Sequence, residues 1–154
     1  MMDYPIYIHF LFASIGTLGF CILFHVPPRH MTPASIGGGL GWITFVYLTT
    51  NGSSSIAACF LGACVVSTFA EFFSRAGKEA TTLFIIPGII PLVPGAPLYY
   101  TMRSLLDNDF DTAARLGTEA LFMAGSIAIA LLLVASITRI IMVIIKGFQT
   151  KLKV

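Results

Sequence analysis

Residues 85–100 read IIPGIIPLVPGAPLYY, with four prolines and two glycines inside an otherwise apolar run. A proline inside a helix removes one backbone hydrogen bond and clashes with the carbonyl four residues back, which costs about 3 kcal/mol. In lipid, irregular backbone is tolerated only where protein buries it or a watery cavity meets it. We therefore expect this run to break, and to lie at the centre of an assembly rather than on a lipid-facing rim.

The rest of the chain contains further long apolar runs. Only 10% of the 154 residues are charged and 56% are hydrophobic, whereas soluble domains carry about 25% charged residues. A membrane span needs roughly 20 mostly apolar residues. We predict an all-α polytopic integral membrane protein that forms one membrane domain over residues 1–154. Its five expected spans are residues 6–26, 34–50, 56–73, 83–106 (broken) and 117–146.

The first run is expected to be a retained transmembrane helix. It has no basic leader and ends in Pro27-Pro28-Arg29 instead of a small-x-small cleavage site, so it does not resemble a signal peptide. The last run is expected to begin as a helix at an N-cap near Asn108 or Asp109, with its first turns outside the hydrocarbon.

The basic residues indicate an orientation. With five alternating spans, seven of the nine lysines and arginines fall on one side, and only Arg103 and Arg115 fall on the other. The positive-inside rule then places the N-terminus outside and the C-terminus in the cytoplasm of a plasma (inner) membrane.

The broken run is most economically built as two half-helices joined by an unwound turn at Pro94-Gly95. Pro97 suits the first turn of the second half, where its missing N–H is no loss. That half would direct free N–H groups and a positive dipole into the membrane, an arrangement suited to a carboxylate. Discontinuous helices of this kind recur at the substrate sites of secondary transporters. A kinked structural helix or a re-entrant hairpin without a ligand fits equally well.

Small residues recur at four-residue spacing, as at Gly37/Gly41 and Ala58/Gly62. Such faces let helix backbones approach closely in lipid. They predict a packed interface, which would slide during transport, stay static, or meet another subunit.

Two motifs resemble those of the threonine/serine exporter family. Pro91-Leu92-Val93-Pro94-Gly95, followed by Tyr99 and Met102, resembles its Pro-x-x-Pro-Gly-x-x-x-Tyr-x-x-Met signature, and Phe24 to Arg29 resembles its Phe-x-Val-Pro-x-Arg. The chain length is similar to that of the family's stand-alone small subunit (YjjB-like). Pro97 departs from the signature.

The resemblance implies a two-component secondary exporter, driven by proton-motive force, with a larger membrane subunit of the same family as partner. It implies small carboxylate-bearing substrates, either threonine and serine or a dicarboxylate such as succinate. Together with the broken run, it assigns the substrate pathway to one set of residues: Pro87, Gly88, Pro91, Pro94, Gly95, Tyr99 and Met102.

Ionisable residues in or near the spans are candidates for charge or proton roles, because a charge at the bilayer centre costs ~3 kcal/mol or more. Arg29, Arg103 and Glu119 are the candidates. Glu119 would carry a proton, pair with an arginine, or lie at the interface beside Arg115. Arg103 would attract an anionic substrate, reach headgroups, or oppose the acidic turn at residues 107–109. His9 is expected at the outer interface or, less commonly, in a proton relay.

Other classes of function are less well supported. An assembly subunit whose larger partner holds the substrate site is the main alternative, and a channel-like homo-oligomer is another. Paired carboxylates, nucleophile–base spacings and metal-ligand clusters are absent from the sequence, so we expect neither an enzyme nor a metal or cofactor. The three cysteines lie in apolar runs as small buried side chains, and a net charge of +2 does not predict nucleic-acid binding.

Overall fold

The computed structural model describes the backbone of residues 5–151 and the side chains of residues 5–145. Within that part, all regular secondary structure is helical, as predicted. The elements are α1 (Ile6–Leu23), α2 (Pro28–Thr50), α3 (Ser55–Gly77), α4 (Thr82–Ile89), the short 3-10 helix η1 (Ile90–Leu92), α5 (Gly95–Leu106) and α6 (Phe110–Lys151). Lys146, Lys151 and Lys153, which contribute to the predicted charge asymmetry, lie outside the described side chains.

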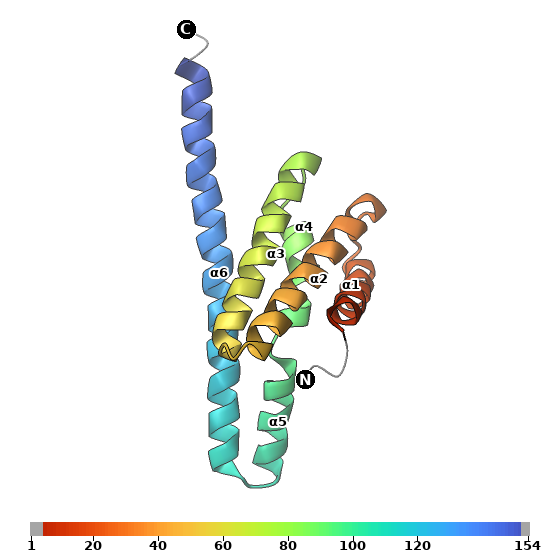
Figure 1. Ribbon diagram of the computed structural model, residues 1–154, viewed down its shortest axis with the longest axis vertical. Coiled ribbons are helices and arrows are strands. Elements are labelled where there is room, and N and C mark those ends of the chain that lie inside the picture. The colour runs from red at the N-terminus through yellow and green to blue at the C-terminus, as the bar shows by residue number, and fades with distance from the viewer. Residues whose placement is uncertain (1–4, 152–154) are drawn as a thin grey trace.

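The helices run up and down in sequence order, and α2 lies between α1 and α3 (Figure 1). α4 packs across α2 and α3, whereas α5 and the first half of α6 form a hairpin that extends beyond the other helices (Figure 1). The molecule is therefore a bundle of α1–α4 and part of α6, which we call the sheaf, with a projecting α5–α6 hairpin.

Three helices, α1, α3 and α6, are long and apolar enough to cross a bilayer, and the bent pair formed by α4–η1 and α5 makes a fourth. α2 is not among them. Its 23 residues are long enough, but its glycines and threonines make it less apolar. The crossing of α2, and with it the count of five, stays a prediction.

Several helix ends lie where local sequence signals place them. The Ser54 side chain accepts a hydrogen bond from the amide of Ala57 at the start of α3, and Asp109 does the same for Thr112 at the start of α6. Serine and aspartate are both favoured at N-cap positions, and the cap at Asp109 was predicted. The hydrogen bonds from the Thr112 side chain and amide lower the pKa of the exposed Asp109 carboxyl.

The second helix begins before the apolar run that predicted its span. The expected span starts at residue 34, whereas helix α2 begins at Pro28 and contains Pro33. Pro28 occupies the first helical position, where a missing N–H costs nothing. Pro33 lies near the start of the helix and lacks the N–H that would donate to the carbonyl of Arg29, so it costs the helix one backbone hydrogen bond.

Candidate functional site

The broken span is confirmed, and the break falls at Val93–Pro94, between η1 and α5. The two halves meet at an angle of 51°. Val93 and Pro94 have non-helical backbone torsions, with ψ of 132° and 57°. Pro97 is the third residue of α5, so it lies in the first turn of the second half, as expected.

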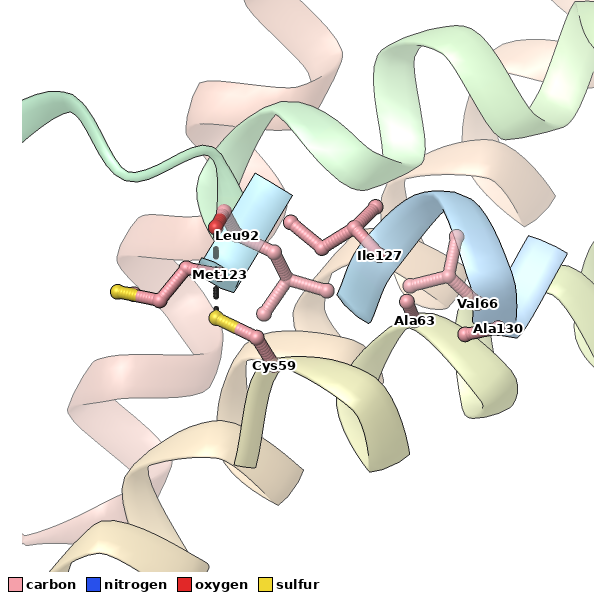
Figure 2. Close-up of a cluster of buried hydrophobic side chains, with 7 residues drawn as sticks. All are labelled: Cys59, Ala63, Val66, Leu92, Met123, Ile127 and Ala130. Atoms are coloured by element: carbon pink, nitrogen blue, oxygen red, sulfur yellow. Dashed lines mark hydrogen bonds between the residues drawn. The ribbon is translucent and has the colours of Figure 1, made fainter. Parts of the chain in front are cut away.

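The break is anchored in the protein core by Leu92, which is 2% exposed. Figure 2 shows Leu92 packed into a cluster contributed by α3 and α6, whose other members are Cys59, Ala63, Val66, Met123, Ile127 and Ala130. The carbonyl of Leu92 accepts a weak hydrogen bond from the Cys59 thiol at 3.7 Å. Protein therefore buries Leu92 and Pro94 on either side of Val93, which is itself 48% exposed, so the described residues meet only in part the condition for irregular backbone in a membrane.

The first turn of α5 holds fewer free amides than its position suggests. The amide of Gly95 donates to the carbonyl of Val93 at 2.7 Å, and that of Leu98 donates to Pro94 at 3.2 Å. Pro97 has no N–H. Within the described chain, only Ala96 is left as a first-turn donor for an anion, so the prolines themselves reduce the anion site expected at this helix end.

A hollow of about 690 Å³ lies beside the break, between α1, Trp42 and η1. Ile90 and Pro91 of the broken segment form one wall. The lining is mostly apolar, contrary to the polar cavity that we expected. Its titratable group is His9, whose Nε2 atom is buried without a hydrogen-bond partner among the described residues. Such an atom is available to a ligand or a water molecule.

The predicted pathway residues separate into two groups. In the first group, Pro87, Gly88 and Pro94 are buried, and a Cβ atom on Gly88 would lie 2.9 Å from Val66 Cγ1. This close contact gives Gly88 a packing role. Pro91 alone among the predicted residues lines the hollow.

The second group lies on the exposed surface of the projecting hairpin. Gly95 borders open space, and Tyr99 and Met102 are 62% and 63% exposed. α5 packs against α6 and against no other described helix. The signature is therefore contiguous in sequence, but the structure does not gather it around one cavity.

Arg29 belongs to a charge cluster that joins two turns at one end of the sheaf. It forms an ion pair with Glu79 in the α3–α4 loop, and its Nε donates to His30 Nε2 at 2.7 Å. His30 is 7% exposed and lies 3.5 Å from the Glu79 carboxylate. Arg29 thus ties the α1–α2 turn to the α3–α4 loop, in addition to its position in the family-like motif.

The other two charge candidates have weaker contacts. Arg103 lies 3.9 Å from Asp107, with both side chains about two-thirds exposed, so it opposes the acidic turn as one alternative anticipated. Glu119 is half-buried and forms no ion pair with any described residue, Arg103 and Arg115 included.

The small-residue faces form the close helix contacts that their spacing predicted. A Cβ atom on Gly38 would lie 2.3 Å from Thr17 Oγ1 of α1, and one on Gly41 would lie 2.3 Å from Val66 Cγ2 of α3. The two faces of α2 therefore meet α1 and α3 without room for a methyl group.

Sequence reasoning missed three residues that the structure brings to prominence: Trp42 and Ile90 in the hollow and Glu79 in the charge cluster. Glu79 is 50 residues from Arg29, so spacing along the chain gave no signal for the pair. Trp42 is the chain's single tryptophan, which offered a weak signal.

The chain is similar to known proteins over most of its length. Residues 9–137 match the family described as "Threonine/Serine exporter, ThrE". An uncharacterized protein of Haemophilus influenzae is 30% identical over 96 residues, which is 62% of this chain and 32% of that protein. The matched stretch of the chain thus spans about a third of the length of this relative. No solved structure matches the chain. With a broken membrane span and a family match over residues 9–137, the chain belongs to the threonine/serine exporter family.

Proposed function

We propose that the chain is the small membrane subunit of a two-component secondary exporter of small carboxylate-bearing metabolites. The substrates are threonine and serine or a dicarboxylate such as succinate. Transport proceeds by alternating access, and residues 87–99 form part of a midplane site shared with a larger subunit. The function is transport and not catalysis.

One observation carries this proposal: a membrane span of an exporter-family chain is broken beside a hollow. Ile90 and Pro91 line this hollow of about 690 Å³, and the unwound backbone follows within three residues. Its volume lies within the ~300–1,000 Å³ range of small-molecule sites. The unpaired His9 Nε2 supplies a polar contact in the lining of the hollow.

The projecting hairpin supports a larger partner. Its α5 helix has no buried residue, and it exposes large apolar side chains on a surface that only α6 covers in part. In a membrane, such a helix packs against lipid or another subunit. The matched relative is about three times the length of the matched segment, which accords with a second portion that acts beside this one.

The charge distribution supports a cytoplasmic C-terminus. Arg29, Arg75 and Lys78 lie at the end where α1 meets α2 and α3 meets α4 (Figure 1). Arg103 and Arg115 lie on the hairpin, at the opposite end. By the positive-inside rule, the first end faces the cytoplasm.

A second function is favoured by the outward placement of Tyr99 and Met102. If these residues bind the partner instead of substrate, the chain is an assembly subunit and the larger partner holds the substrate site. The two functions predict different effects of a substitution at the hollow in a complex that still forms. Transport is lost if the hollow is part of the substrate site, and it is kept if this chain is an assembly subunit.

Reconstitution tests the proposal. The chain is inserted into proteoliposomes with and without its larger subunit, and efflux of labelled threonine, serine and succinate is measured under a proton gradient. We expect efflux of one substrate class when both subunits are present and none from either alone. Full efflux from the larger subunit alone would refute the proposed role of this chain.

A further inference from the structure

A second cleft of about 580 Å³ lies between the last turns of α3 and the C-terminal half of α6, where the two helices diverge (Figure 1). It is separate from the hollow at the break, and the two cavities share no lining residue. Its polar side chains are those of Glu71, Arg75, Thr81, Ser136 and Arg139.

The side chains from α6 follow one helical face. Leu132, Ser136, Arg139 and Val143 recur at three- and four-residue spacing, so this face is directed at α3. Ser136 is small, and the space between the helices is left open above the packed core. The cleft is therefore built by helix divergence and is bordered by polar groups on both sides.

The charges in the cleft are not balanced. Glu71 is only 14% exposed and accepts a hydrogen bond from Arg75 at 2.7 Å. Glu71 is therefore more buried than Arg75, which is 39% exposed. Arg139 forms no ion pair with any residue from 5 to 145. One guanidinium charge in the cleft is uncompensated, and a guanidinium group suits bidentate binding of a carboxylate.

The cleft connects to the charge cluster at the same end of the sheaf. Thr81 Oγ1 donates to Ser74 Oγ at 3.1 Å, and Ser74 Oγ donates to the carbonyl of Glu79 at 2.6 Å. The carboxylate of Glu79 pairs with Arg29. The cleft therefore lies at the end that we assign to the cytoplasm, where an exporter takes up its substrate.

We propose that this cleft is a loading site for an α-amino acid, with Arg139 as the partner of its carboxylate and Glu71 as an acceptor for its ammonium group. This inference rests on the proposed export function. Arg75 hydrogen-bonds one carboxylate oxygen of Glu71, which leaves the other oxygen to accept from an ammonium group. A zwitterion can therefore place its carboxylate on Arg139 and its ammonium group on Glu71, whereas the second carboxylate of a dicarboxylate would meet an acceptor at Glu71 instead of a donor. The cleft therefore selects threonine or serine over succinate.

A cysteine at Ser136 tests the charge of the cleft. Cys21 and Cys59 are fully buried, so a Cys64→Ala, Ser136→Cys variant of the full-length chain presents one reactive thiol. In phosphatidylcholine nanodiscs, mass spectrometry follows its modification by a sulfonate-bearing and a trimethylammonium-bearing methanethiosulfonate. Each rate is divided by the rate of the same reagent with a free thiol. After this correction, we expect the sulfonate reagent to react about tenfold faster than the trimethylammonium reagent, because a positive cleft concentrates anions.

Two arginine variants locate the cause. Arg139→Gln is expected to bring the two rates to parity, whereas Arg115→Gln, on the same helix at the other end, leaves the preference unchanged. Equal rates in the chain with both arginines intact would overturn the proposal.

Substrate protection tests the ligand. Threonine is expected to slow the modification, succinate to slow it less, and threoninamide, which lacks the carboxylate, to leave it unchanged. Protection by threonine that persists in Arg139→Gln, or protection by phosphatidylglycerol lipid but not by threonine, would overturn the proposal. The second result would assign the cleft to a lipid headgroup. The charge preference requires no transport, so a chain that keeps it but exports nothing refutes the proposed function and not the charged cleft.

Discussion

Gly41 offers a quantitative test of the packing that holds the sheaf together. A Cβ atom at this position would lie 2.3 Å from Val66 Cγ2 and 3.2 Å from the carbonyl oxygen of Gly62. The first distance is about 1.2 Å shorter than the ~3.5 Å at which carbon atoms pack. Val66 is 2% exposed and belongs to the cluster around Leu92, so it has little freedom to move away.

The Gly41→Ala variant is therefore expected to lose about 1–3 kcal/mol of unfolding free energy, the usual cost of overpacking a core. Gly125 is the matched control, because a Cβ atom there meets nothing within 4 Å. Gly125→Ala is expected to gain up to about 1 kcal/mol, since alanine is the better helix former.

The assay is unfolding of the chain in bicelles by titration with sodium dodecyl sulfate, followed by far-UV circular dichroism. Val66→Ala removes the clashing methyl group, so the Gly41→Ala, Val66→Ala double variant is expected to be more stable than the sum of the single effects predicts. A coupling of about 0.5–3 kcal/mol is typical of residues in contact. A Gly41→Ala variant as stable as the parent, or strictly additive effects, would refute the packing argument.

Three further predictions address the break and the helix ends. Gly95→Trp fits into open space, so we expect normal membrane abundance by immunoblot but reduced export, whereas the control Gly125→Trp keeps both. Unchanged export in Gly95→Trp would count against a role of the break in transport. Hydrogen bonds from Thr112 lower the pKa of the Asp109 carboxyl. The contribution of Asp109 to stability is therefore present above the unfolded pKa of ~3.9 and is lost as the pH falls through the folded pKa. Asp109→Asn, which still caps the helix, should remove this part of the pH dependence of stability in thermal melts. Glu79→Gln breaks the ion pair with Arg29, which is 70% exposed. We expect it to lower the unfolding free energy by no more than about 1 kcal/mol in the same detergent titration. A loss several times larger would show that the pair is shielded from solvent.

Features governed by local chemistry could be predicted from the sequence. The prolines of residues 85–100 required a break, and it falls within one residue of the expected turn. Asp109 marked a helix start because its short side chain satisfies a free amide. The glycine spacing on α2 correctly predicted close helix contacts.

Features governed by the choice of helix neighbours could not be predicted in the same way. Spacing along a chain determines which residues share a helix face, but not which helix that face meets. It gave no indication that Tyr99 and Met102 project away from the hollow, nor that His9 lies in it. The partnership of Arg29 with Glu79 depends on the packing of two turns that are far apart in sequence.

The hollow beside the break is tested most directly through two glycines of α1. Gly16 lines the hollow and Gly19 does not, and a Cβ atom meets nothing within 4 Å at either position. The measurement is the initial rate of labelled threonine efflux from vesicles that contain the larger subunit with either Gly16→Phe or Gly19→Phe, at matched protein levels. If substrate passes this hollow, Gly16→Phe removes most of the efflux and Gly19→Phe retains it. Equal efflux from the two variants would contradict a substrate path beside the broken span.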